Sequence, residues 1–251
     1  MQYEKIIPRA RAGFIIPTSN RMVEPQVQRY MPQGVIPHFT RIGMTNKHKA
    51  PLEQQMPKIA AAAEALAESK MSSIILQCTG TSMSGGLDME KQVIEAMQQA
   101  SGVPCATAAS SLTSAFRALN ATRLVFVSET KQPDHDKKLK YLREAGYEVV
   151  ADKAVGLAGT DEYCTMPPKL WFDVTAALKH DKADAYFISC ANIHSIDVIE
   201  ELEKVLNKPV VTSNQAAIWK SLRLAGIYDA VPGLGHLLRH DAKASGVMAA
   251  E

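Results

Sequence analysis

The sequence predicts an α/β fold: two similar α/β lobes with mostly parallel sheets, related by pseudo-twofold symmetry, with an active site between them. Three observations predict this fold. Short apolar runs alternate with helical patterns along the chain, which is typical of parallel sheets covered on both faces. Cys190 follows Cys78 by 190 − 78 = 112 positions, at the same point of an equivalent segment. The opening strands, near Phe14 and Val125, are offset by a similar 125 − 14 = 111 positions.

The first half of the chain begins with apolar runs at 13–16 and 35–42, each of which predicts a strand, although Pro37 interrupts the second. Residues 52–69 are rich in Ala, Glu and Met, with apolar residues three and four apart, so we expect a helix there. The same reasoning continues the alternation with a strand at 74–77, a helix at 89–100, a strand at 103–107 and a helix at 112–119.

The second half repeats this order. Its elements are strands at 123–127 and 147–151 around a helix at 136–144, a helix at 170–179, a strand at 185–189, a helix at 197–206, a strand at 209–212 and a helix at 216–224. We expect residues 1–120 and 217–251 to form the N-terminal lobe, and residues 121–216 to form the C-terminal lobe.

Length and composition exclude several classes of protein. The 251 residues are 46% hydrophobic, enough for a large buried core, whereas a net charge of +2 and 6% aromatic residues do not suit nucleic-acid or anionic-membrane partners. No run of about 18 apolar residues predicts a transmembrane helix, and residues 1–10 lack the apolar core of a signal peptide. We therefore expect a cytoplasmic protein, and the sequence leaves open whether it forms a homo-oligomer.

Two of the four cysteines occupy positions that suit chemistry. Cys78 and Cys190 each stand at the end of a predicted buried strand, directly before a polar turn. A thiol can act as a nucleophile, as a base when it is a thiolate, or as an acid. The alternative is that each is a small apolar residue buried in a strand, but the duplicated placement favours the chemical role. We expect no such role for Cys105 or Cys164.

The turns after these strands offer groups that suit a carboxylate. Thr79, Gly80, Thr81 and Ser82 supply hydroxyls and approachable amides, and the strand-end amides are Asn20, Asn192 and Asn214. Helix capping is the competing role, and we prefer it for Thr81, Ser82 and Asn214. The histidines show no metal spacing, and the glycine-rich motifs that bind dinucleotides or phosphates are missing. His194 alone lies close enough to Cys190 in the sequence to form a Cys–His pair.

Four segments resemble the maleate isomerase and arylmalonate decarboxylase branch of the aspartate/glutamate racemase superfamily: FIIPTSN at 14–20, CTGTS at 78–82, SCAN at 189–192 and KPVVTSNQA at 208–216. Together they span nearly the whole chain in the expected order. The resemblance implies a cofactor-free enzyme that acts on a small-molecule carboxylate in a site between two lobes. Where the branch has a tyrosine after the mid-chain strand, this sequence has Ser128-Glu129-Thr130-Lys131, and Thr130 or Lys131 would replace it. Acids stand at Asp161 and Glu162, where the isomerases have an asparagine.

The resemblance also assigns roles. Racemases of the superfamily use two cysteines for proton exchange, and maleate isomerases use the first as a nucleophile and the second as a proton donor. Arylmalonate decarboxylases have only the second, with glycine at the first position. We therefore expect Cys78 to be the nucleophile or base and Cys190 the proton donor. The residues expected to bind the substrate are Asn20, Thr79, Gly80, Thr130, Ala191 and Asn192.

Three functions remain open from the sequence. The first is a cofactor-independent two-cysteine isomerase of a small carboxylate, with maleate cis–trans isomerisation as the single reaction we predict, or a racemase of a carbon acid. The second is a decarboxylase in which Cys190 alone is essential. The third is a binding protein without catalytic activity, whose thiols would have ordinary reactivity.

Overall fold

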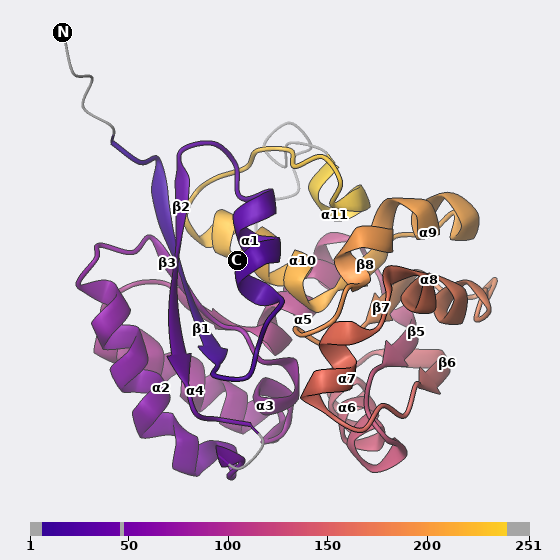
Figure 1. The fold of residues 1–251 in the computed structure, drawn as a ribbon, viewed down its shortest axis with the longest axis horizontal. Coiled ribbons are helices and arrows are strands. Elements are labelled where there is room, and N and C mark those ends of the chain that lie inside the picture. Colours follow the sequence, from indigo (N-terminus) through magenta and orange to yellow (C-terminus); the bar gives the residue numbers. More distant parts are fainter. Residues whose placement is uncertain (1–6, 46–47, 240–251) are drawn as a thin grey trace, which may run out of the picture.

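The computed structural model describes residues 7–45 and 48–239, which form two four-stranded parallel sheets (Figure 1). The first sheet has the strand order β2-β1-β3-β4, and the second has β6-β5-β7-β8. The strands are β1 (Ala10–Pro17), β2 (Val35–Ile42), β3 (Ser73–Leu76), β4 (Cys105–Thr107), β5 (Arg123–Ser128), β6 (Glu148–Ala154), β7 (Ala185–Ile188) and β8 (Val210–Thr212). Because the two sheets share one strand order, the predicted α/β fold with two similar lobes is confirmed.

The helices of the first half are α1 (Val23–Tyr30), α2 (Leu52–Ala67), α3 (Thr79–Met83), α4 (Gly86–Ser101) and α5 (Ala108–Ala118). Those of the second half are α6 (Gln132–Glu144), α7 (Thr160–Thr165), α8 (Pro168–Ala176), the 3-10 helix η2 (Ser195–Val198), α9 (Ile199–Leu206), α10 (Ser213–Leu224) and α11 (Gly235–Arg239). The sequence predicted the longer helices. It missed α1, α3, α7 and α11, which are short and carry too few apolar residues to set a helical period.

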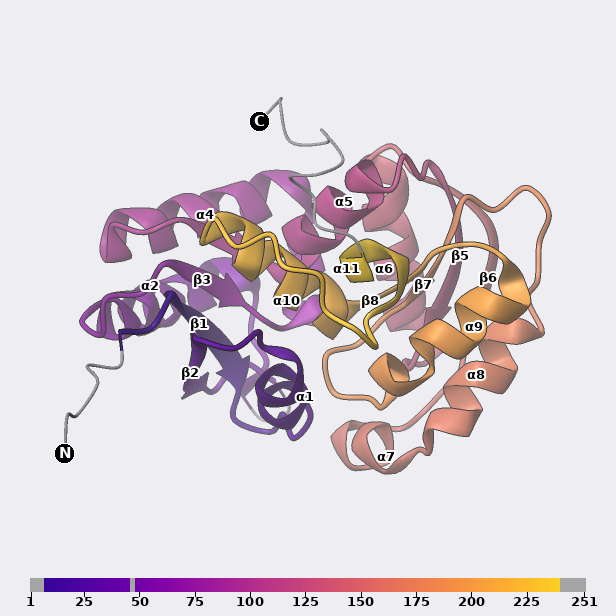
Figure 2. The ribbon, with the colours of Figure 1, turned by 90° about the horizontal axis from the view of Figure 1, so that it is seen from above.

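The central strands are buried on both faces because helices cover each sheet (Figure 2). Phe14, Ile15 and Ile16 of β1 are fully buried, although they are consecutive and therefore point to alternate faces. Strand β2 lies at the edge of its sheet, which explains how it accommodates Pro37, since an edge strand tolerates a missing N–H.

One hydrophobic cluster spans both lobes, and a second lies within the first lobe, around α2 and α4. Helices α5 and α10 follow the last strand of each sheet and pack against each other. The Phe116 ring of α5 lies edge-on to Phe187 of β7, with 5.6 Å between ring centroids. The terminal helix α11 packs on α9 and β8. The lobe boundaries given above remain a prediction.

Within the described ranges, no helix combines the length and apolar character needed to cross a membrane. Cytoplasmic location remains a prediction.

Candidate active site

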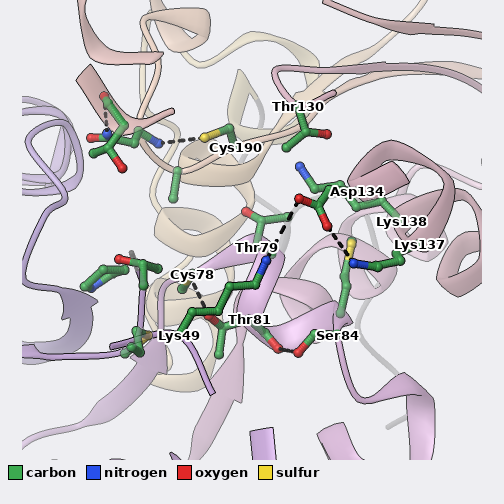
Figure 3. Close-up of a pocket in the computed structure, with 18 of the residues that line it drawn as sticks. Lys49, Cys78, Thr79, Thr81, Ser84, Thr130, Asp134, Lys137, Lys138 and Cys190 are labelled. Carbon is green, nitrogen blue, oxygen red and sulfur yellow. Dashed lines mark hydrogen bonds and ion pairs between the residues drawn. The ribbon is translucent and has the colours of Figure 1, made fainter. Parts of the chain in front are cut away.

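A cavity of about 710 Å³ lies between the lobes, at the carboxyl ends of the strands. This is where parallel α/β sheets bind ligands. All eight residues expected at the site line it: Asn20, Cys78, Thr79, Gly80, Thr130, Cys190, Ala191 and Asn192. Figure 3 shows Cys78 and Cys190 entering from opposite walls, one from each lobe. The structure therefore brings together residues that are up to 172 positions apart, since 192 − 20 = 172.

Cys78 stands between β3 and α3, and it is buried apart from its face on the cavity. Its Sγ lies 3.0 Å from the Oγ1 atom of Thr81. Burial raises the pKa of this thiol, whereas hydrogen bonds from the Thr81 hydroxyl and backbone N–H lower it in part. The turn that follows the strand therefore supplies donors to a thiolate at this position.

Cys190 follows β7 by two residues and has a backbone φ of +106°, an uncommon conformation for a residue other than glycine. Its N–H donates to Ser213 Oγ at 3.1 Å, and its Sγ accepts the N–H of Asn192 at 3.3 Å. Burial, followed by the negative charge of Glu129, raises the pKa of the Cys190 thiol well above its usual value. The two thiols thus face one cavity in different electrostatic surroundings.

Thr79 supplies a hydroxyl that is available to a ligand. Its side chain lines the cavity and is almost fully buried, yet among residues 7–45 and 48–239 its Oγ1 atom has no hydrogen-bond partner. Because an unpaired buried hydroxyl costs free energy, an atom of this kind is suited to a ligand oxygen. Next to it, a side chain at Gly80 would point into open space, so its backbone is approachable from the cavity.

Asn20 and Asn192 form a reciprocal pair of contacts across the lobes. Asn20 Nδ2 donates to the Ala191 carbonyl at 3.0 Å, and the Arg21 N–H donates to Asn192 Oδ1 at 2.8 Å. Asn20 Oδ1 also accepts the N–H of Val23 at 2.8 Å, which caps α1. Both amides therefore hold the walls of the cavity, and their contact with a substrate remains a prediction.

The buried cation of the cavity wall is a residue that the sequence reasoning missed. Lys131, which was expected there, is exposed and lies outside the cavity lining. Lys138, about two turns further along α6, is buried in the cavity wall. Its Nζ donates to both carboxylate oxygens of Glu129, at 2.9 and 2.8 Å, and to Ser189 Oγ at 3.1 Å. In the sequence, Lys138 stands among other charged residues, Asp136, Lys137 and Lys140, which is typical of a solvated helix face; the docking of α6 buries Lys138 alone of these four.

Three other expectations can be compared with the structure. His194 does not pair with Cys190; its Nε2 lies 3.0 Å from the Cys164 carbonyl oxygen. Asp161 and Glu162 are outside the cavity lining. Asp161 pairs with Arg21 of the other lobe. Across residues 7–45 and 48–239, no cluster of three His, Cys, Asp or Glu side chains is arranged to hold a metal ion.

Helix α7 places Tyr163, another residue that the sequence reasoning missed, in the cavity lining. Burial raises the pKa of the tyrosine, and the nearby charges of Glu129 and Cys190 add to this effect.

The cavity also has an apolar side, formed by Met44, Leu52, Met83 and Met89. The space therefore combines two thiols and polar groups with room for an apolar substituent.

A family model described as arylmalonate decarboxylase matches residues 12–238 of this sequence. The chain belongs to the arylmalonate decarboxylase family. A maleate isomerase of Pseudomonas putida is 25% identical over 241 residues, covering 91% of this chain and 96% of that protein. An arylmalonate decarboxylase of Bordetella bronchiseptica is 27% identical over 173 residues, covering 67% of this chain and 72% of the other.

Solved structures of this family share the fold. A crystal structure of a maleate isomerase from Pseudomonas putida matches with a TM-score of 0.85 and 23% identity, covering 92% of this chain and 99% of that one. A cysteine-to-serine mutant of the Nocardia farcinica maleate cis-trans isomerase, with a covalently bound succinylcysteine intermediate, matches with a TM-score of 0.82 and 23% identity over 93% of this chain and 99% of that chain. The recognition of this branch from the sequence is confirmed, and so is the expectation of an enzyme.

Proposed function

We propose that the protein is a cofactor-independent isomerase of a small carboxylate, and that maleate-to-fumarate conversion is its reaction. The observation that carries the proposal is that Cys78 and Cys190, from opposite lobes, line one cavity. A decarboxylase that needs only a proton donor has no use for a thiol at position 78. The maleate isomerases among the relatives support the reaction, and one of them carries a succinyl group on cysteine.

The reaction begins with addition of the Cys78 thiolate to one alkene carbon of maleate. The alkene electrons move towards the far carboxylate, and the Cys190 thiol gives its proton to the neighbouring carbon, which leaves a succinyl thioether. Rotation about the new single bond brings the carboxylates to opposite sides. The Cys190 thiolate then removes a proton, the C–S bond to Cys78 breaks, and fumarate leaves with both thiols restored to their starting states.

The polar groups of the walls hold the substrate during this rotation. Thr79 Oγ1, which lacks a partner, donates to a carboxylate oxygen. Gly80 and Thr130 line the same cavity, and the Thr130 hydroxyl lies 3.2 Å from Ser128 Oγ. In the proposed complex, the Gly80 N–H and the Thr130 hydroxyl donate to the same carboxylate. These contacts keep one carboxylate fixed while the other end turns.

The apolar side of the cavity supports a second candidate substrate. Maleate is a small dianion, whereas Met44, Leu52, Met83 and Met89 offer a surface that an alkyl or aryl substituent would cover. A substituted maleate fits this combination as an isomerase substrate, and an arylmalonate fits it as a decarboxylase substrate. Racemisation of a carbon acid requires the same two thiols.

One experiment distinguishes these reactions. The purified protein is incubated in heavy water with maleate, substituted maleates, amino acids and arylmalonates, and the products are followed by proton NMR. We expect fumarate or its substituted analogue. Deuterium exchange in an amino acid without a change of skeleton would indicate a racemase, and loss of carbon dioxide from an arylmalonate would indicate a decarboxylase. No reaction with any compound would contradict the proposal.

A further inference from the structure

A buried ion pair, Glu129–Lys138, lines the same cavity as the two thiols, and the proposed two-cysteine reaction gives it no role. The side chains of Glu129 and Lys138 are only 6% and 4% exposed. Both line the cavity together with Cys78 and Cys190. Figure 3 shows Lys138 reaching from α6 into the space that Thr79 and Thr130 also face.

The pair is fixed in place. Lys138 Nζ makes hydrogen bonds to both oxygens of Glu129, at 2.9 and 2.8 Å, and a third to Ser189 Oγ at 3.1 Å. Ser189 is the residue directly before Cys190. Two hydrogen bonds therefore join the charges to each other, and the third ties them to the segment that carries the second thiol. Removing two charges from water costs free energy that apolar residues would not cost, so stability alone does not explain the pair.

The proposed reaction requires the two thiols to differ. One must be a thiolate and the other a thiol at the same pH, yet the cysteines occupy equivalent positions after β3 and β7. A difference must therefore come from groups that the lobes do not share. Glu129 and Lys138 both belong to the second half of the chain, and their opposite charges act on both sulfur atoms.

We propose that Glu129 and Lys138 are positioning residues that make the two thiols inequivalent: the Glu129 carboxylate keeps the proton on Cys190, and the Lys138 ammonium favours the thiolate of Cys78. The inference rests on the proposed two-cysteine function. It states which thiol enters the reaction with a proton and which without one.

The electrostatics of the two sulfur atoms support this orientation. At Cys190, the negative charge of Glu129 raises the thiol pKa more than any other group, after burial itself. The positive charge of Lys138 lowers this pKa by a smaller amount than Glu129 raises it. For Cys78, after burial and the Thr81 hydrogen bonds, Lys138 lowers the pKa more than Glu129 raises it. The ion pair thus acts with opposite net sign on the two thiols.

Other charged or titratable groups that line the cavity come from several elements. Asp134 and Lys137 are on α6, Lys49 precedes α2, Glu53 is on α2 and Tyr163 is on α7. Asp134 pairs with Lys137 at 2.7 Å and lies 3.9 Å from Lys49. These groups are retained in every variant below, so a change in the thiols reports on Glu129 and Lys138.

The test measures the thiols directly and uses no substrate. Alkylation of the whole protein by iodoacetamide is followed across the alkaline pH range, and peptide mass spectrometry separates Cys78 from Cys190. In the unmodified protein, the midpoint pH for Cys190 lies above that for Cys78. Glu129→Gln lowers the Cys190 midpoint, and Lys138→Met raises the Cys78 midpoint. At a pH below the midpoint, each unit of pKa change alters the alkylation rate about tenfold.

Two further variants keep the test decisive. Glu129→Gln combined with Lys138→Met leaves no unpaired buried charge, so it answers the question even where a single variant fails to fold. The separation between the two midpoints must shrink in this double variant. Asp173→Asn, which removes the carboxylate of an exposed pair with Lys169 on α8, must leave both midpoints unchanged. Cys164 serves as a reference thiol within each sample.

Equal shifts of both thiols, or an unchanged separation in the double variant, would overturn the inference. Because no substrate is present, either result leaves the proposed isomerisation standing. Conversely, a protein that does not act on maleate could still show the predicted separation of midpoints.

Discussion

Asn20 and Asn192 join the two lobes by reciprocal hydrogen bonds, at 3.0 Å to the Ala191 carbonyl and 2.8 Å from the Arg21 N–H. Each side chain contacts the backbone beside the other. The hydrogen bond from Asn20 also holds the carbonyl of Ala191, the residue directly after Cys190. The walls that carry the thiols are therefore fixed relative to each other by the same amides that the sequence indicated for substrate binding.

Asn20→Asp tests this contact. Aspartate keeps the oxygen that caps α1 through the N–H groups of Met22 and Val23, but it loses the donor to Ala191. We expect a loss of more than about 1 kcal/mol in the free energy of unfolding, because one hydrogen bond is lost and a buried carboxylate oxygen then faces the Ala191 carbonyl, and a fall in kcat. Urea unfolding and steady-state kinetics measure the two effects. Stability equal to that of the unmodified protein would contradict the contact.

Thr79→Val removes the unpartnered hydroxyl at almost constant volume. If this hydroxyl donates to the substrate carboxylate, KM rises about tenfold or more, because a hydrogen bond to a charged group contributes about 1.5–3 kcal/mol. Stability should stay the same or increase, since an unsatisfied buried group is lost. Thr113→Val, on α5 and outside the cavity lining, is the control. A normal KM in Thr79→Val would show that the hydroxyl does not contact substrate.

Thr81→Val tests the activation of the nucleophile. The Thr81 hydroxyl lies 3.0 Å from Cys78 Sγ and lowers the pKa of that thiol. Without this donor, the Cys78 pKa increases, and a higher pH is needed to form the thiolate. The acidic limb of the kcat/KM profile should therefore move to higher pH, whereas activity at high pH recovers. An unchanged profile would mean that Thr81 does not support the thiolate.

Glu90 predicts a pH dependence of stability outside the site. Its carboxylate is buried and accepts hydrogen bonds from Thr107 and Tyr141. Burial raises its pKa in the folded state, so the folded protein binds this proton more tightly than the unfolded chain does. Its stabilising contribution is present below the unfolded pKa and is lost as pH rises through the folded pKa. The difference in unfolding free energy between the unmodified protein and Glu90→Gln should therefore change between the unfolded and the folded pKa of Glu90. A difference that stays constant with pH would contradict a raised pKa of the buried Glu90 carboxyl.

The sequence predicted the fold and the two thiols because both depend on local patterns that occur twice. Strand, polar turn and helix recur around Cys78 and Cys190, and the carboxyl ends of parallel strands converge at one edge. Glu129, Lys138 and Tyr163 could not be predicted in the same way. Their places depend on how α6 and α7 dock against the cavity: Lys131 stands before α6 and is exposed, whereas Lys138, inside α6, is buried in the cavity wall.

The most direct test of the two-cysteine isomerase is the rate of fumarate formation from maleate by Cys78→Ala, measured beside Cys190→Ala and the unmodified protein. We expect each substitution to lower kcat by about a thousandfold or more, because the nucleophile and the proton donor act in one sequence of steps. Both variants should retain the fold, as judged by circular dichroism. Turnover by Cys78→Ala at the rate of the unmodified protein would contradict the role of Cys78 as the nucleophile.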